Sequence, residues 1–174
     1  MQPLLTKLRA QFPQLTFTAG PQFYWSPETS EIFYQVDARG QRATWSLLHE
    51  TGHALLEHKN YSSDMHLLQL EMAAWERARE LAASLTIVID ENHIQDCLDT
   101  YRDWLYQRSI CPSCSTKCLQ QDDSREYRCF NCHTAWRVSD NRFARPYRAH
   151  KNVPVTTVSS SLPIFNERHS FLGP

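Results

Sequence analysis

The chain has 174 residues, of which 41% are hydrophobic and 21% charged, and its formal net charge is −1. This length predicts one domain of ordinary size with room for a small appendage, and the composition is typical of a soluble globular protein. No apolar run approaches the roughly 20 residues of a membrane helix, and the first residues do not resemble a secretory signal. We therefore expect a cytoplasmic protein without a membrane partner.

Charge is distributed unevenly along the chain. Residues 1–110 contain 9 Lys and Arg against 14 Asp and Glu, whereas residues 111–151 contain 8 against 4. An acidic larger piece followed by a small basic one indicates two modules with different partners. We expect a core at 1–108, a small domain at 109–140 and an extended, flexible tail at 141–174, whose last part is rich in Pro and Ser.

The N-terminal third predicts one helix and a small sheet. Pro3–Phe12 has the apolar spacing of an amphipathic helix, and Leu15–Thr18, Phe23–Trp25 and Glu31–Val36 are candidate strands separated by turn-forming residues. Short connections of this kind favour an antiparallel sheet with one helix packed on it. Together with the helices that follow, this arrangement predicts an α+β fold.

Three further helices are predicted from apolar spacing and helix-forming composition. The first begins at Gln41 or Thr44 and ends at His58, the second covers Met65–Ile89, and the third covers Asn92–Arg108.

The first of these helices contains the sequence WSLLHETGHALL, in which His49, Glu50 and His53 form an HExxH motif. Residues four apart lie on one face of a helix, so the two histidines can offer imidazole nitrogens to one zinc ion. Glu50 can then reach a water on that ion and act as general base. Gly52 lowers helix stability, which is explained if another element packs against the backbone there.

Glu71 is the candidate third ligand, 18 residues after His53 in the next helix. Two antiparallel helices joined by a short loop can bring its carboxylate to the two imidazoles, and the small residues Ala73, Ala74 and Ala78 leave room for a helix to approach. Two histidines and one glutamate with an open fourth position form a catalytic zinc site rather than a structural one.

These motifs resemble the ImmA/IrrE family of metallopeptidases. Arg42-Ala43-Thr44 leads into LLHETGHALL, and Glu71 is followed by Ala74-Trp75, which resembles the family's RxT segment before HExGHxxL and its later Glu-x-x-Ala segment, although four residues separate Thr44 from His49 here where the family pattern RxTxxHExGHxxL has two. The resemblance covers roughly residues 31–89. It implies a compact gluzincin-like core with endopeptidase activity, in some members against a transcriptional repressor. Trp75 stands where Asn is commoner, so a polar role is not expected at that position.

A SprT-like protease, which acts on DNA-bound proteins, is the alternative among enzymes. That family also joins HExxH to a C-terminal zinc ribbon, but its third ligand is a histidine, for which His66 is the candidate here. A second alternative is a non-catalytic binding module in which the second domain recruits a partner.

The expected reaction is hydrolysis of a peptide bond by a water that zinc activates and Glu50 deprotonates. Candidate residues for contacting the substrate or its oxyanion are Tyr34, Tyr61 and His66, with His58 as a further candidate. The substrate is an extended segment of a specific protein, and we expect it to pair with Glu31–Val36 as an edge strand.

Four cysteines predict a second, structural zinc site. Cys111 and Cys114 form one CxxC pair, Cys129 and Cys132 form another, and the spacing is that of a zinc ribbon. A fragment of about 30 residues has too little core to fold without such a site. The chain is thus expected to bind two zinc ions, one catalytic and one structural, with Cys118 and His133 as non-ligands.

Basic and aromatic residues are interleaved through and beyond this ribbon. They could bind nucleic acid through phosphate contacts and stacking, although a ribbon that stabilises the protein or docks another protein is the alternative. The residues concerned are Arg125, Tyr127, Arg128, Phe130, Trp136, Arg137, Arg142, Phe143, Arg145, Tyr147, Arg148 and Lys151.

Overall fold

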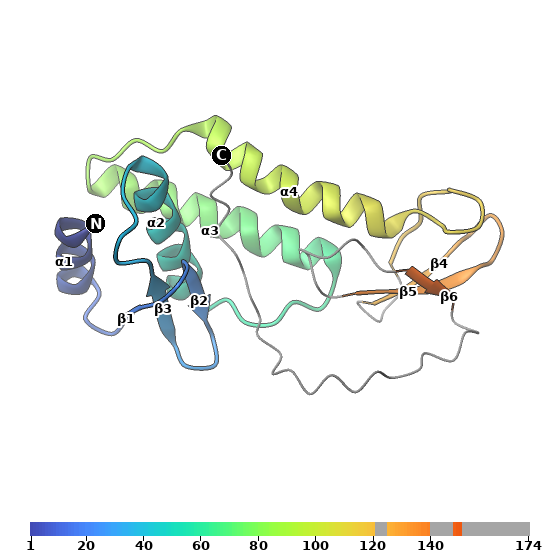
Figure 1. The fold of residues 1–174 in the computed structure, drawn as a ribbon, viewed down its shortest axis with the longest axis horizontal. Helices are drawn as coiled ribbons and strands as arrows, with labels where there is room; N and C mark the ends of the chain where they lie inside the picture. Colours follow the sequence, from blue (N-terminus) through green and yellow to red (C-terminus); the bar gives the residue numbers. More distant parts are fainter. Residues whose placement is uncertain (121–124, 140–147, 151–174) are drawn as a thin grey trace. The chain divides into compact units, whose positions relative to one another are not determined.

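The computed structural model describes residues 1–120 and 125–139, and the backbone of 148–150. In these residues the chain forms helices and two small sheets, which confirms the α+β class (Figure 1). Among the helices described, none is both long and apolar enough to span a bilayer.

The chain divides into two compact units. The described part of the first comprises residues 1–60 and 69–95, and that of the second comprises 61–68 together with the described residues from 96 onward. The predicted boundary after residue 108 therefore lies inside the second unit, which combines the predicted ribbon with residues from the neighbouring helices.

The first unit contains a three-stranded sheet, β1 (Thr16–Ala19), β2 (Tyr24–Ser26) and β3 (Glu31–Tyr34), in the order β1-β3-β2. β2 pairs with β3 in antiparallel fashion, but β1 pairs with β3 in parallel. The prediction of an antiparallel sheet was therefore wrong for one of the two pairings. Two successive chain reversals give β3 the direction of β1, and β3 then lies between its two neighbours instead of outside β2.

The central place of β3 also corrects the prediction that Glu31–Val36 is an edge strand. Ile32 is fully buried and lies opposite Phe17 on one side and Trp25 on the other, so both sides of β3 are paired. The described sheet has its edges at β1 and β2. An added peptide strand could therefore pair only with one of these two strands.

Two helices of the first unit pack beside this sheet (Figure 1). α1 (Gln2–Gln11) contacts β1 and buries Leu5 and Leu8 completely. α2 (Gln41–Leu55) contacts β2 and β3, and it begins directly after Gly40, whose φ of 86° favours glycine. Of the two predicted starts, Gln41 is therefore correct.

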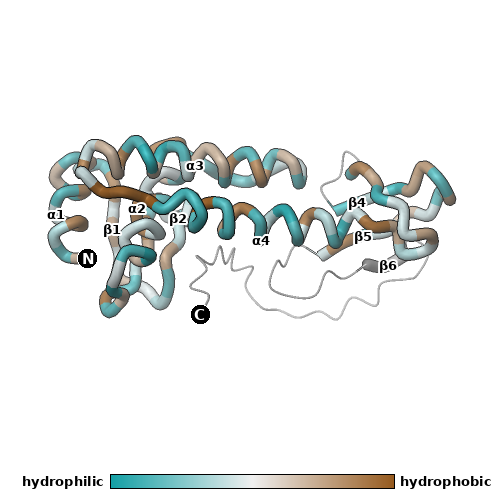
Figure 2. Tube along the Cα trace, turned by 90° about the horizontal axis from the view of Figure 1, so that it is seen from above, coloured by the Kyte–Doolittle hydropathy of each residue, from teal (hydrophilic) through white to brown (hydrophobic). Residues whose placement is uncertain are grey.

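α3 (Asp64–Ser84) ends earlier than predicted, and α4 (Glu91–Ser109) follows it. Thr86 adopts a left-handed conformation with φ 57°, and the amide of Ile87 donates to the carbonyl of Ala82, which is a Schellman ending. Figure 2 shows the connection after α3 as a continuous apolar stretch. The indole Nε1 of Trp45 donates to the carbonyl of Val88 in this connection.

The second unit contains a three-stranded antiparallel sheet, β4 (Glu126–Arg128), β5 (Ala135–Val138) and β6 (Arg148–His150). Because β6 pairs with β5, the ribbon sheet extends beyond the predicted limit at residue 140. The rest of the predicted tail, apart from these backbone residues, lies outside the described part of the chain.

A buried polar network joins β4 and β5 of the predicted ribbon to helical residues of the same unit. The hydroxyl of Tyr127 donates to the carboxylate of Asp64, and Arg108 Nε lies 3.4 Å from the same carboxylate oxygen. Trp136 Nε1 donates to the carbonyl of Arg108 at 3.1 Å. The side chains of all four residues are almost completely buried, so the ribbon and these helical residues share one core.

Candidate functional site

The structure brings His49, His53 and Glu71 together in one cluster. Glu71 Oε2 lies 3.3 Å from His49 Nε2 and 3.5 Å from His53 Nε2, and the two Nε2 atoms are 3.2 Å apart. A tetrahedral zinc with bonds of about 2.0–2.1 Å places its nitrogen and oxygen ligands roughly 3.3–3.4 Å apart. The three ligand atoms therefore have the spacing of three corners of a zinc coordination tetrahedron.

Glu71 supports this interpretation because its carboxylate is buried directly beside the two imidazoles. Its side chain is fully buried, and neither carboxylate oxygen accepts a hydrogen bond from the described residues. Burial raises the pKa of this carboxyl group, but the neighbouring imidazoles of His53 and His49 outweigh that effect and hold the pKa well below its usual value. A buried carboxylate is stable only with a compensating positive charge, which a metal ion provides.

The helices reach this arrangement through a direct backbone contact at Gly52. A Cβ atom built on Gly52 would lie 2.5 Å from the carbonyl oxygen of Ala74, far inside van der Waals contact. Only glycine lets α2 approach α3 so closely. The expectation that another element packs against Gly52 is thus confirmed, and this contact holds Glu71, three residues before Ala74, beside the two histidines.

Glu50 lies next to the cluster in the sequence and is held by β2. Its Oε2 accepts a hydrogen bond of 2.7 Å from the backbone N–H of Trp25, and its side chain is buried. Trp25 lies on an edge strand, and this N–H points away from β3 toward Glu50. The outer side of β2 therefore faces the carboxylate that was predicted to act as a base.

The residues predicted to contact substrate do not join the metal-ligand group of the described chain. Tyr34 is a buried residue of β3, and Tyr61 packs in the second unit against an apolar cluster that includes Leu67 and Trp104. His66 Nδ1 accepts a hydrogen bond from the amide of Ser62 at 3.1 Å. The role predicted for these three side chains has no support in this geometry.

Three residues support the two histidines: His58 was predicted only as a candidate for contacting the substrate or its oxyanion, and no supporting role was predicted for Trp75 or His93. His58 Nδ1 lies 2.8 Å from Nδ1 of His53. The ring of Trp75 stacks on His49 with centroids 4.2 Å apart, and His93 packs edge-on against Trp75. Trp75 thus holds the ring of His49 by stacking. The spacing of His58 from His53 was visible in the sequence, but its orientation depends on the turn after α2.

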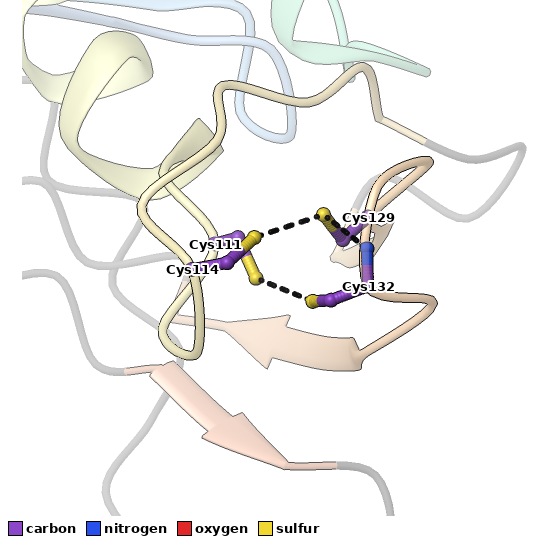
Figure 3. A group of neighbouring side chains, drawn as sticks. All are labelled: Cys111, Cys114, Cys129 and Cys132. Atoms are coloured by element: carbon purple, nitrogen blue, oxygen red, sulfur yellow. Dashed lines mark hydrogen bonds between the residues drawn. The ribbon is translucent and has the colours of Figure 1, made fainter.

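The four cysteines of the predicted ribbon form a second group that could hold a metal ion, with their sulfur atoms turned toward one another (Figure 3). The Sγ atoms of Cys111 and Cys132 are 3.5 Å apart, as are those of Cys114 and Cys129. Zinc with bonds of about 2.3 Å places its sulfur ligands roughly 3.8 Å apart. The group therefore needs only a small expansion to hold one zinc ion.

The two cysteine pairs have the same local geometry. In each, the residue after the second cysteine is left-handed, namely Ser115 and His133, and the amide of each donates to the carbonyl of the first cysteine at 3.0 Å. A threonine follows, and its hydroxyl lies 3.3 Å from Sγ in the first pair and 3.2 Å in the second. The repeated pattern CxxCxT, present as CPSCST and CFNCHT, is the sequence signal for these threonines.

Electrostatics distinguish the thiols of this group. Hydrogen bonds from the side chain and backbone of Thr116 lower the pKa of Cys114 to about 5, whereas burial raises the pKa of Cys111 to about 11. A bound cation would draw all four toward the thiolate form. Burial also raises the pKa of Cys118 to about 11, and this thiol is not among the four grouped cysteines.

The aromatic residues proposed for base stacking divide into two kinds. Tyr127 and Trp136 are buried and stacked on each other, so they belong to the ribbon core and the prediction was wrong for both. Phe130 is 71% exposed and follows the exposed Arg128 by two residues. The side chains of the remaining candidates, from Arg142 to Lys151, lie outside the described residues.

Comparison of the chain with protein-family models, with curated proteins and with solved structures found no significant match.

Proposed function

We propose that the chain is a zinc-dependent endopeptidase of the ImmA/IrrE type that cleaves a specific protein substrate, such as a transcriptional regulator. The observation that carries the proposal is the position of Glu71 Oε2, which lies 3.3 Å from His49 Nε2 and 3.5 Å from His53 Nε2. Glu50 directly follows His49 in the chain. Two imidazoles and one carboxylate leave a fourth position for water or substrate, which is the arrangement of hydrolytic zinc sites.

Zinc held by His49, His53 and Glu71 would polarise the scissile carbonyl and lower the pKa of water. Glu50 takes a proton from the attacking water and later donates it to the leaving amine. The amide of Trp25 orients this carboxylate by a 2.7 Å hydrogen bond. Because the same amide lies on the outer side of β2, an extended peptide that adds to this edge would cross directly in front of Glu50.

The cysteine group supports a structural zinc, for which four thiolates and no open position are typical. The second unit is small, and a bound ion supplies stability that its limited core does not. Binding of nucleic acid by the ribbon remains a prediction, with Arg128 and Phe130 as the exposed pair to test.

Substitution of Glu50 by Gln tests the proposed activity. Glutamine keeps an oxygen that accepts the hydrogen bond from Trp25 but cannot take up a proton at pH 7. Protein N-termini are compared between cells that express wild type and cells that express the variant, with zinc content measured on both purified proteins. We expect new N-termini only with wild type, at equal zinc content. Equal cleavage by a zinc-loaded Glu50→Gln variant would contradict the proposal.

A further inference from the structure

The chain reverses directly after α2, and the residues of this turn donate hydrogen bonds to the last turn of the helix. Glu57 adopts a left-handed conformation with φ 51°, its amide donates to the carbonyl of Ala54, and the amide of His58 donates to the carbonyl of His53 at 3.0 Å. These two bonds form a Schellman motif, in which glycine is the usual left-handed residue. A glutamate in this position is strained, and strain of this kind persists only where the surrounding structure enforces it.

This turn places the side chain of His58 against that of His53. Their Nδ1 atoms are 2.8 Å apart, their rings meet edge to face with an angle of 72°, and both side chains are buried. The indole Nε1 of Trp25 donates to the carbonyl of His58 at 2.8 Å, which fixes the turn to β2. His58 is thus held from two sides while it contacts a proposed zinc ligand.

The tautomer of His53 follows from this contact. A neutral imidazole carries one proton, and a nitrogen that binds a metal must offer its lone pair. Nε2 of His53 faces His49 and Glu71, so with a metal bound at Nε2 the proton of His53 is on Nδ1, and His58 Nδ1 is then the acceptor at hydrogen-bonding distance. Ligand histidines are commonly oriented in this way by a carboxylate or a carbonyl group, and here a second imidazole takes that place.

We propose that His58 is a positioning residue that accepts the hydrogen bond from His53 Nδ1 and thereby directs Nε2 toward the metal. The inference rests on the proposed metal site formed by His49, His53 and Glu71. His49 is held differently, because its Nδ1 has no hydrogen-bond partner among the described residues and its ring stacks on Trp75. Loss of His58 therefore affects one ligand specifically.

Two substitutions at His58 separate hydrogen bonding from packing. His58→Asn retains an acceptor oxygen one bond beyond Cγ, as Nδ1 is, whereas His58→Leu fills similar space without an acceptor. Zinc affinity is measured by chelator competition, and the four-cysteine site of the same chain serves as the internal reference. Substitution with Co²⁺ gives a second readout, since the absorption bands of a nitrogen and oxygen site differ from those of a thiolate site.

We expect His58→Leu to weaken zinc binding at the histidine site by roughly 10- to 100-fold, to change its Co²⁺ spectrum, and to leave the cysteine site unchanged. His58→Asn should stay within a few-fold of wild type. The control Glu57→Gly keeps the turn without strain and should bind zinc as wild type does. Wild-type affinity in His58→Leu, or an equal loss in the Leu and Asn variants, would overturn the inference. A wild-type protein with zinc at the cysteines alone would overturn the metal site itself.

Discussion

Gly52 packs directly against the backbone of Ala74, with no side chain between α2 and α3 at this point. The three proposed ligands lie on either side of this contact, His49 and His53 on α2 and Glu71 on α3. A side chain at position 52 would force the two helices apart, and any separation lengthens the distances from Glu71 to both imidazoles. The distances between Glu71 and the two imidazoles thus depend on Gly52, which is not itself a proposed metal ligand.

Gly52→Ala should destabilise the protein and weaken metal binding, although alanine is the better helix former. A Cβ 2.5 Å from the carbonyl oxygen of Ala74 must displace backbone, and overpacking of this kind costs about 1–3 kcal/mol. Denaturant unfolding and zinc affinity measure the two effects. Ala73→Gly at an exposed neighbouring position is the control and should lower stability by about 1 kcal/mol without loss of zinc. A Gly52→Ala variant with raised stability and unchanged affinity would contradict the contact.

The sequence predicted the two groups of neighbouring side chains because the spacing of their members reports geometry directly. His49 and His53 share a helix face at four-residue spacing, and the small residues after Glu71 indicated where another helix could approach. The two CxxC pairs likewise specify a compact ligand group. In each case the chemistry depends on local spacing, which a sequence displays.

Features that depend on pairing between distant segments were not predicted. The place of β3 between β1 and β2 is a choice among sheet orders that short strands do not specify. The buried contact of Tyr127 with Asp64 joins residues 63 positions apart in the chain. The contact of His58 with His53 was not predicted, because the orientation of His58 depends on a left-handed Glu57, a conformation that sequence patterns assign to glycine.

Substitution of the candidate third ligand distinguishes the two families of enzyme. Glu71→Ala should reduce the zinc content from two ions per chain to one, because a two-histidine site binds zinc weakly. His66→Ala is the matched comparison and should keep both ions, since His66 accepts a hydrogen bond from Ser62 and is not part of the ligand group. Metal analysis of the purified variants measures this directly. The reverse pattern would support the SprT-like alternative.

Loss of the ribbon site should unfold the second unit. Structural zinc contributes about 10–16 kcal/mol of apparent binding free energy at pH 7, which exceeds the stability of a small domain. Cys129→Ser should therefore lose the ribbon zinc and the near-ultraviolet circular dichroism of the stacked Tyr127 and Trp136. Cys118→Ser, which removes a buried thiol outside the ligand group, should retain both. A folded, zinc-free ribbon in the Cys129 variant would contradict a structural role.

The contact of Tyr127 with Asp64 makes the stability of the second unit depend on pH. Burial, followed by the hydrogen bond to Asp64, raises the pKa of Tyr127 well above its usual value. The unfolded chain releases this proton near pH 10, whereas the folded chain retains it. The stabilisation is therefore complete below pH 10 and is lost as pH rises from 10 toward the folded pKa.

Tyr127→Phe should lower the free energy of unfolding by roughly 1.5–3 kcal/mol at pH 8, because the hydrogen bond to a charged group is lost. Above pH 10 the difference in free energy of unfolding between the variant and wild type should narrow by at most about 1.4 kcal/mol per pH unit. Denaturant unfolding of the zinc-loaded proteins at pH 8, 10 and 11 measures it. Tyr106→Phe, at a side chain that is 44% exposed, is the control for loss of a tyrosine hydroxyl outside this buried network. A difference that stays constant across this range would mean that Tyr127 ionises as readily in the folded chain as in the unfolded one.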